Sequence, residues 1–334
     1  MKWGVTKPRV YVTRLLPKEA MDRIHSHCDA KVWGGELSPP RDVLLRNVAD
    51  VEGLVCLLTD RIDSKLMDRA PNMKVVSNYA VGFDNIDVTE ATNRGILIGN
   101  TPDALTETTA DFAFALIMSA ARRIAEADSY VRGGKWHTWG PMLLLGRDVH
   151  NSTLGIIGLG RIGAAVARRA RGFNMHILYS SRVRQRQREQ ELGIEYAELD
   201  KVLAESDFIT VHTTLSPGTH HLLSAKHFEK MKRTCILVNT ARGPVVDNMA
   251  LYDALRAGNI LCAALDVTEP EPLPANHPLL TLNNMIVTPH IASASTATRR
   301  RMALIAADNL IAGLSGQLGP ATVNPQALNK HSQA

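Results

Sequence analysis

The chain has 334 residues, of which 45% are hydrophobic and 21% are charged, and its formal net charge is +5. This length exceeds that of one small core and predicts two domains, and the composition is globular, neither disordered nor membrane-spanning. The modest positive charge favours anionic ligands, but no basic stripe with interleaved aromatic residues indicates a nucleic-acid partner.

The cysteines predict a reducing environment and no metal site. Cys28, Cys56, Cys235 and Cys262 show neither C-x-x-C spacing nor a metal-type grouping with histidine. Residues 1–8 lack the apolar region of a signal sequence, and the longest apolar stretch, at 110–121, is too short to cross a bilayer. We therefore expect a cytoplasmic protein with reduced thiols and no membrane partner.

The first hundred residues alternate between short apolar runs and amphipathic patterns. We expect strands at 9–15, 30–33, 51–58, 73–79 and 95–99, and helices at 18–27, 40–50, 64–70 and 85–94. This alternation predicts a parallel sheet with helices on its faces. A long apolar helix follows at 107–123, and then a Gly- and Trp-rich stretch at 132–141 that forms either a surface loop or an arm against a second subunit.

A second α/β series begins at Thr153 with an apolar run and a glycine-rich turn, and it indicates dinucleotide binding. The glycines of Gly158-Leu159-Gly160-Arg161-Ile162-Gly163 fit the G-x-G-x-x-G fingerprint, and a helical pattern and a second strand at 175–179 follow. A helix beginning at this turn offers free N–H groups and a positive dipole end to phosphates. We expect cofactor contacts from Gly158, Gly160, Arg161, Ile162 and Gly163.

The residues after the second strand favour NADP(H) over NAD(H), although NAD(H) stays a usable cofactor. NAD-specific sites place an acid about 20 residues past the glycines, whereas this chain has Tyr179-Ser180-Ser181-Arg182 there and no acid before Glu189. Ser181 and Arg182 are suited to a ribose 2′-phosphate, which a guanidinium binds through two hydrogen bonds. The alternative is that residues 182–188 form only a solvated basic helix face.

Polar side chains follow the later strands, expected near 207–212, 234–239, 260–266 and 285–288. Because ligands bind at the carboxyl ends of parallel strands, these residues are predicted to line one site. Thr214 and Thr240 are expected near the cofactor, and Asp266 is expected to accept a hydrogen bond from the nicotinamide carboxamide. The residues with the strongest chemical signal are Arg242, Glu271 and His290.

These three side chains suit the reduction of a 2-keto acid by hydride transfer. His290 is the predicted proton donor, since the pKa of imidazole lies nearest neutrality. A carboxylate such as Glu271 would hold the ring protonated and fix its orientation. Arg242 would bind the substrate carboxylate through paired hydrogen bonds. Each residue alone has a structural alternative, as a strand-end histidine, an ion-pair partner or a solvated loop acid.

Four motifs of the chain resemble the D-isomer-specific 2-hydroxyacid dehydrogenases, and within them most closely the glyoxylate/hydroxypyruvate reductases. They are Leu-Gly-Arg-Ile-Gly at 159–163, Asn-Thr-Ala-Arg-Gly-Pro-Val-Val-Asp at 239–247, Leu-Asp-Val-Thr-Glu-Pro-Glu-Pro at 265–272 and Thr-Pro-His-Ile-Ala-Ser-Ala at 288–294. The stretches 78–87 and 100–106 support the likeness, which extends over nearly the whole chain.

The resemblance implies two Rossmann-like, doubly wound parallel-sheet domains with an active-site cleft between them. The substrate domain would comprise 1–104 and 297–334, and the dinucleotide-binding domain 105–296. The resemblance implies the triad Arg242, Glu271 and His290, and a homodimer formed through 107–146. It also implies that Thr109 lies near the nicotinamide and that substrate contacts come from Leu57, Val81, Gly82 and Ser293, with backbone N–H groups of Val81 and Gly82 on the carboxylate.

Three departures from the family pattern leave alternatives open. Thr213 stands where many relatives have Pro, Thr268 replaces a common aromatic residue, and Ala292 replaces Gly. The expected activity is NADPH-preferring reduction of glyoxylate or hydroxypyruvate to the D-2-hydroxy acid. A reductase of 2-ketogluconate or another longer 2-keto acid is one alternative, and a corepressor-like protein that senses the nicotinamide cofactor is another.

Overall fold

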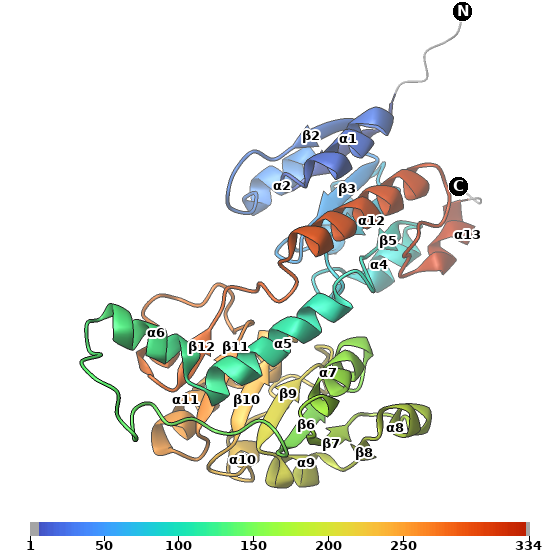
Figure 1. Cartoon of the computed structure of the whole chain (residues 1–334). Helices are drawn as coiled ribbons and strands as arrows, with labels where there is room; N and C mark the ends of the chain where they lie inside the picture. Colours follow the sequence, from blue (N-terminus) through green and yellow to red (C-terminus); the bar gives the residue numbers. More distant parts are fainter. Residues whose placement is uncertain (1–6, 332–334) are drawn as a thin grey trace, which may run out of the picture. The chain divides into compact units, whose positions relative to one another are not determined.

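The computed structural model describes residues 7–331, and the chain divides into two compact units (Figure 1). The first unit extends to Leu105 and resumes at Ala294, and the second comprises Thr106–Ser293. The signal-sequence prediction rests partly on residues 1–6, which lie outside the described residues. Within 7–331, no helix has the length and apolarity needed to span a membrane. The assignment of substrate to one unit and coenzyme to the other stays a prediction.

The first unit contains a five-stranded parallel sheet in the order β2-β1-β3-β4-β5. Its strands are β1 (Arg9–Val12), β2 (Asp29–Val32), β3 (Gly53–Cys56), β4 (Val75–Asn78) and β5 (Leu97–Gly99). Every residue of β3 and β4 is buried, as expected for central strands of a parallel sheet covered on both faces. Strands β1, β3, β4 and β5 are shorter than predicted, whereas β2 has the predicted length and begins one residue earlier.

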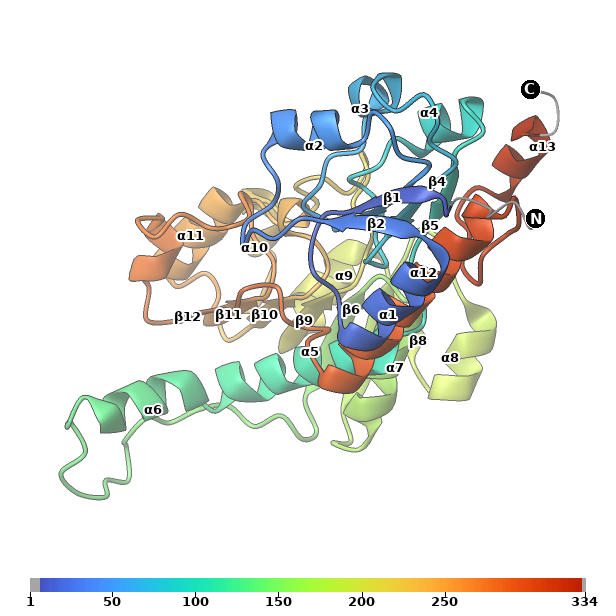
Figure 2. The same cartoon turned by 90° about the horizontal axis from the view of Figure 1, so that it is seen from above.

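Helices from both ends of the chain cover this sheet. They are α1 (Lys18–His27), α2 (Arg41–Asn47), α3 (Ser64–Asp68), α4 (Val88–Asn93), α12 (Thr296–Leu314), η3 (Pro325–Ala327) and α13 (Leu328–His331). Figure 2 shows α1 beside α12, although almost the whole chain separates them in sequence. The Ser77 hydroxyl in β4 donates to the carbonyl of Ala306 at 2.8 Å, so α12 is bonded directly to the sheet.

The second unit contains a seven-stranded parallel sheet in the order β12-β11-β10-β9-β6-β7-β8. Its strands are β6 (Thr153–Ile157), β7 (His176–Ser180), β8 (Glu195–Tyr196), β9 (Phe208–Val211), β10 (Ile236–Asn239), β11 (Cys262–Leu265) and β12 (Met285–Val287). The strand order reverses between β6 and β9, which is the position where open α/β sheets bind ligands. Two parallel-sheet units confirm the predicted α/β class, while the two-residue strand β8 was missed.

The helices of the second unit are α5 (Thr106–Ala121), α6 (Ile124–Arg132), α7 (Arg161–Arg171), α8 (Arg186–Leu192), α9 (Leu199–Glu205), α10 (Ala225–Phe228), η1 (Gly243–Val245), α11 (Asn248–Ala257) and η2 (Pro278–Thr281). The predicted helix at 107–123 ends at Ala121, because Arg123 adopts a left-handed conformation with φ of 54°. No residue of α6 is buried, and the loop after it returns to β6 (Figure 1).

Candidate active site

The three residues of the predicted triad follow three neighbouring strands of the second unit. Arg242 comes after β10 and precedes η1, Glu271 lies in the loop after β11, and His290 comes three residues after β12. Strands β10, β11 and β12 are adjacent and parallel, so their carboxyl ends share one edge of the sheet. The fold therefore brings together three loops whose key residues are distant in sequence.

His290 and Glu271 form a direct contact at this edge. His290 Nδ1 lies 2.5 Å from Glu271 Oε1, and the side chains are 24% and 34% exposed. The backbone N–H of Thr268 donates to Glu271 Oε2 at 3.4 Å, so the second carboxylate oxygen is bonded as well. A carboxylate at Nδ1 requires the proton on that nitrogen, which leaves Nε2 of His290 to exchange a proton with a ligand.

Asp266 holds the loop that carries His290. Its side chain is 1% exposed, and Oδ1 accepts from the Thr288 hydroxyl at 2.6 Å and the Ile291 N–H at 2.8 Å. Oδ2 accepts from the Ala292 N–H at 2.7 Å, and the backbone carbonyl of Asp266 accepts from the His290 N–H at 2.9 Å.

These bonds give Asp266 a structural role. Its hydrogen bond to a nicotinamide carboxamide stays a prediction. His290 has a φ of 54°, a left-handed conformation that is costly for a residue other than glycine. The backbone and side-chain bonds of Asp266 hold residues 288–292 in the shape that this conformation requires.

The loop that carries Arg242 packs closely against the loop that carries Glu271. A Cβ added to Gly243 would lie 1.9 Å from the carbonyl oxygen of Thr268, so only glycine fits there. Asn239 shapes the turn, since its side chain accepts from the Ala241 N–H at 3.0 Å and donates to the Arg242 carbonyl at 2.9 Å. The half-buried Arg242 guanidinium donates to the Ala241 carbonyl at 2.8 Å.

The turn between β6 and α7 has the shape that a pyrophosphate needs. Gly158 has a φ of 97°, and a Cβ there would lie 2.7 Å from the Thr213 backbone nitrogen. A Cβ on Gly163 would lie 2.3 Å from the Gly158 carbonyl oxygen, whereas Gly160 faces open space with nothing within 4 Å. Helix α7 begins at Arg161 without a side-chain cap, so its N-terminus presents the positive end of the helix dipole to an anion.

The other expected cofactor residues lie on the same unit. Thr240 directly follows β10, and its buried hydroxyl has no hydrogen-bond partner among the residues described. An orphaned buried hydroxyl fits a position that a bound ligand completes. Thr109 is buried on α5, whereas Thr214 is exposed in the loop after β9, and Ser293 is buried at the end of the unit.

The basic run after β7 divides into arginines with different partners. The Ser181 hydroxyl accepts from the Leu159 N–H at 2.8 Å, which ties this run to the glycine turn. Arg184 binds Glu189 at 2.7 and 2.9 Å, and this guanidinium lowers the pKa of Glu189 to about 2. Arg188 donates to the Leu159 and Gly160 carbonyls at 2.7 and 3.0 Å. Arg182 is exposed, and its guanidinium has no hydrogen-bond or ion-pair partner within 7–331.

In the first unit, the loop after β4 presents backbone donors. The Asn78 and Asn100 side chains donate to the carbonyls of Gly82 and Val81 at 2.9 and 2.8 Å. The N–H groups of Val81 and Gly82 make no hydrogen bond with the described residues, so they remain available to an anion. Leu57 directly follows β3, and its N–H donates to Asp60 at 2.8 Å. The sequence reasoning missed both asparagines, which lie inside the motifs at 78–87 and 100–106.

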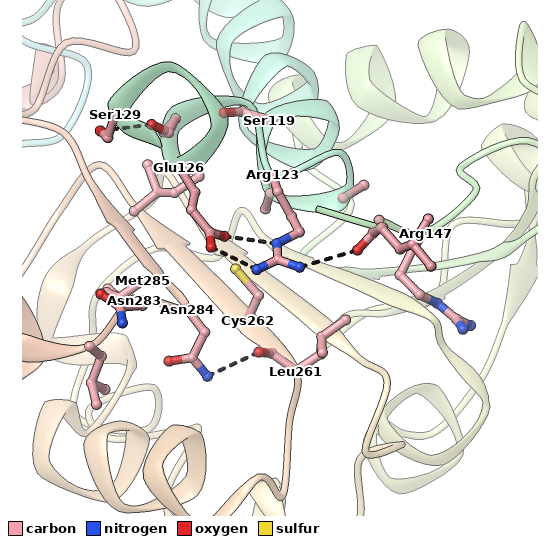
Figure 3. A pocket seen from close by; sticks show the side chains of 17 residues that line it. Ser119, Arg123, Glu126, Ser129, Arg147, Leu261, Cys262, Asn283, Asn284 and Met285 are labelled. Atoms are coloured by element: carbon pink, nitrogen blue, oxygen red, sulfur yellow. Dashed lines mark hydrogen bonds and ion pairs between the residues drawn. The ribbon is translucent and has the colours of Figure 1, made fainter. Parts of the chain in front are cut away.

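A hollow of about 570 Å³ lies elsewhere on the second unit, among α5, α6 and the start of β11 and β12 (Figure 3). Arg123 lies on one side of it and binds Glu126 at 2.7 and 2.8 Å and the Leu145 carbonyl at 3.4 Å. Cys262 and Leu261 also line the hollow. None of the predicted catalytic, cofactor or substrate residues lines this hollow, so it is separate from the strand edge described above.

Residues 114–292 match the family model described as D-isomer specific 2-hydroxyacid dehydrogenase, NAD binding domain. The chain belongs to this family. It is 53% identical over 323 residues to a glyoxylate reductase from Korarchaeum cryptofilum, and the alignment covers 96% of this chain and 97% of that protein. The chain is therefore an oxidoreductase that uses a nicotinamide cofactor.

Two solved structures show the same fold over almost the whole chain. A glyoxylate reductase from Paecilomyes thermophila superposes with a TM-score of 0.85 at 31% identity, covering 96% of this chain and 100% of that one. The NADPH-dependent glyoxylate/hydroxypyruvate reductase from Sinorhizobium meliloti, solved with NADP and malonate, superposes with a TM-score of 0.84 at 32% identity. The superposition covers 96% of this chain and 98% of that one. The resemblance predicted from the four motifs is thereby confirmed.

Proposed function

We propose that this dehydrogenase reduces a small 2-keto acid, glyoxylate or hydroxypyruvate, to the D-2-hydroxy acid, with NADPH as the preferred cofactor and His290 as the proton donor. The observation that carries the proposal is the contact of 2.5 Å between His290 and Glu271 on the sheet edge that also holds the glycine turn. The names of the similar enzymes from Korarchaeum, Paecilomyes and Sinorhizobium support the substrate class.

Each residue of the triad has a separate task in this reaction. A nicotinamide cofactor held at the glycine turn would supply a hydride for the carbonyl carbon, so negative charge would develop on the carbonyl oxygen. His290 donates the proton from Nε2 to that oxygen, and Glu271 stabilises the imidazolium before the transfer. Arg242 binds the substrate carboxylate and so orients the neighbouring carbonyl. The family resemblance also assigns the backbone N–H groups of Val81 and Gly82 to the substrate carboxylate, and neither group has a hydrogen-bond partner among the described residues.

The preference for NADPH rests on Ser181 and Arg182. Arg182 is exposed and unpaired in the described part of the chain, next to a serine that is bonded to the glycine turn. A guanidinium there pairs with a 2′-phosphate, and no carboxylate at the end of β7 is placed to favour a bare ribose hydroxyl. NAD(H) remains a weaker substrate because the glycine turn binds the pyrophosphate that both cofactors share.

We also propose that the chain forms a homodimer through residues 107–146, which include α6 and most of the loop after it. Trp136, Trp139 and Met142 are 61%, 78% and 76% exposed, which is unusual for side chains of this size. The hollow beside α6 offers an apolar surface for the same arm of a second copy. Sedimentation of the purified protein tests this, and the double variant Trp136→Ser/Trp139→Ser is expected to be a monomer with unchanged secondary structure.

A cytoplasmic location is the remaining part of the proposal. The structure contains no disulfide among its described cysteines: Cys28, Cys56, Cys235 and Cys262 are all free. Burial raises the pKa of Cys235 to about 12, which keeps this thiol protonated and inert. Cell fractionation tests the location, and recovery outside the cytoplasm contradicts it.

The decisive experiment follows the loss of NADPH absorbance with the purified full-length chain. Glyoxylate, hydroxypyruvate and a longer acid such as 2-ketogluconate are each tried with NADPH and NADH. We expect the highest kcat/KM with a small keto acid and NADPH. A preference for the longer acid would favour the alternative reductase, and no oxidation with any keto acid would favour a cofactor-sensing binding protein.

A further inference from the structure

Two histidines and a glutamate meet in the second unit, outside the proposed triad. His220 and His221 end the turn that follows β9, and Glu269 lies in the loop after β11, 48 residues after His221. His221 Nε2 lies 2.7 Å from Glu269 Oε2, and His220 Nε2 lies 3.7 Å from Glu269 Oε1. One ligand atom from each residue lies within 4.8 Å of the other two. Both imidazoles thus direct the same ring nitrogen at one carboxylate.

We propose that His220, His221 and Glu269 bind a divalent transition-metal ion of the Zn²⁺ type. Imidazole nitrogen and carboxylate oxygen are the ligands that Zn²⁺, Ni²⁺ and Cu²⁺ accept, and two histidines with one glutamate form a common three-ligand set. Bonds of about 2.0–2.1 Å in a tetrahedral site place the ligand atoms about 3.4 Å apart. The separations of 2.7 and 3.7 Å require only small side-chain rotations to reach that value.

The backbone around the cluster holds the ligands in place. The His221 N–H donates to the Pro244 carbonyl at 2.7 Å, and the Glu269 carbonyl accepts from the Asn248 side chain at 2.7 Å. The two imidazole rings stack with centroids 4.1 Å apart, so each restricts the rotation of the other. A site whose ligands are already positioned loses less conformational entropy when the ion binds.

The surroundings leave room for such an ion. The side chains of His220, His221 and Glu269 are 52%, 38% and 36% exposed, so water completes the coordination. Within residues 7–331, the Glu269 carboxylate pairs with these two imidazoles and with no lysine or arginine that would compete with a cation. The sequence analysis predicted no metal site, because neither C-x-x-C nor a close His/Cys spacing reveals ligands contributed by separate loops.

The test measures metal binding directly and needs neither substrate nor nicotinamide cofactor. The full-length protein is treated with a chelator, and Zn²⁺ is then titrated by isothermal calorimetry in a buffer that does not bind metals. Co²⁺ is titrated in parallel, since coordination by protein ligands changes its visible spectrum. The variants are His220→Ala, which removes the most exposed ligand, and Glu269→Gln, which keeps the shape of the side chain.

His176→Ala is the matched control. His176 is an exposed histidine 3.7 Å from Glu195, with one imidazole instead of two. We expect one Zn²⁺ per chain for the unmodified and His176→Ala proteins. His220→Ala and Glu269→Gln should weaken Zn²⁺ binding by roughly 10- to 100-fold or more. Removing a residue that only hydrogen-bonds to a metal ligand already weakens metal binding by about that factor, and these variants remove a ligand itself.

The proposal is overturned by the absence of stoichiometric Zn²⁺ binding, or by equal affinity in the unmodified protein and both ligand variants. A Co²⁺ spectrum that is unchanged by Glu269→Gln also contradicts it, because the carboxylate would not be a ligand. Since the assay omits the keto acid and the nicotinamide, a negative result leaves the proposed reductase activity unaffected, and an inactive reductase leaves the metal site to be judged by binding alone.

Discussion

The two ends of the seven-stranded sheet use polar side chains in different ways. At the β10–β12 end, the groups proposed for chemistry are bonded to one another or to the loops that carry them, as His290 is to Glu271 and Asp266 is to residues 288–292. At the β7 end, Arg184 and Arg188 are engaged within the protein, whereas Arg182 and Arg186 have no hydrogen-bond or ion-pair partner among the described residues.

This difference separates proton transfer from cofactor recognition. A proton donor must be held at a fixed place with a fixed charge, so its neighbours constrain it from several directions. An arginine that selects one cofactor over another must stay unpaired until the ligand arrives, since a partner carboxylate would cancel its charge. Arg184 shows the opposite case, because Glu189 already binds its guanidinium at two positions.

His290→Ala should produce the largest effect and would separate the two ends most sharply. Loss of the proton donor is expected to lower kcat by roughly 10²–10⁴-fold, while NADPH binding persists because the glycine turn is untouched. Steady-state kinetics and a fluorescence titration of NADPH measure the two quantities. His176→Ala serves as the control. A mild decrease in kcat would mean that another group donates the proton.

Arg242→Ala should damage substrate use next most strongly. Removing the guanidinium removes both the charge that pairs with the substrate carboxylate and its orientation, so kcat/KM for glyoxylate should fall by about 10²-fold or more. Arg242→Lys should recover little, because an ammonium lacks the planar pair of donors. The measurement is kcat/KM at saturating NADPH. Normal kinetics in both variants would contradict the carboxylate-binding role.

Asp266→Asn tests whether the buried carboxylate positions His290. The amide has one acceptor oxygen where the carboxylate has two, so a backbone N–H at 291 or 292 loses its partner, which costs about 1–3 kcal/mol of folding stability. We expect a lower Tm and a lower kcat with a changed pH profile of kcat.

The control for this variant is Asp253→Asn at an exposed position of α11. It should leave both the Tm and the pH profile unchanged. If Asp266→Asn lowers the Tm but leaves the pH profile as it was, Asp266 supports the fold without positioning His290.

Arg182→Ala probes the other end of the sheet. A charge-assisted hydrogen bond to a phosphate contributes about 1.5–3 kcal/mol, so NADPH affinity should fall by roughly tenfold or more while NADH affinity changes little. The ratio of the two Kd values measures this selectivity. Arg184→Ala is the comparison variant, and its ratio should change less. An unchanged NADPH affinity in Arg182→Ala would dismiss the 2′-phosphate role.

Glu189→Gln should give the smallest effect, confined to stability. Because the pKa of Glu189 is lowered to about 2 by Arg184 from about 4.3 in an unfolded chain, the charged pair stabilises the fold above pH 4.3. That contribution declines as the pH falls through about 2. The Tm difference between the unmodified protein and Glu189→Gln should therefore be equal at pH 7 and pH 5 and smaller at pH 3. A difference that already shrinks between pH 7 and pH 5 would contradict the lowered pKa.

Local features of the sequence predict the elements well because their causes are local. An apolar run, the G-x-G-x-x-G spacing and the helical pattern after it identify the turn at Gly158–Gly163, and the structure confirms a positive φ at Gly158. Similarly, fully apolar runs predict buried parallel strands. The break at Arg123 escaped the sequence analysis, because an apolar pattern carries no signal for a left-handed arginine.

The sequence by itself determined the α/β class, the glycine turn, the family and the identities of Arg242, Glu271 and His290 as candidates. The sequence also suggested Glu271 as the partner of His290. Only the tertiary structure decided the partners of other side chains: the 288–292 loop for Asp266, Glu189 for Arg184, and one carboxylate for two histidines. The reason is physical. Backbone conformation and burial depend on residues a few positions apart, whereas a hydrogen bond between loops depends on strand order, which places residues 19 to 48 positions apart within 2.5 to 2.8 Å of each other.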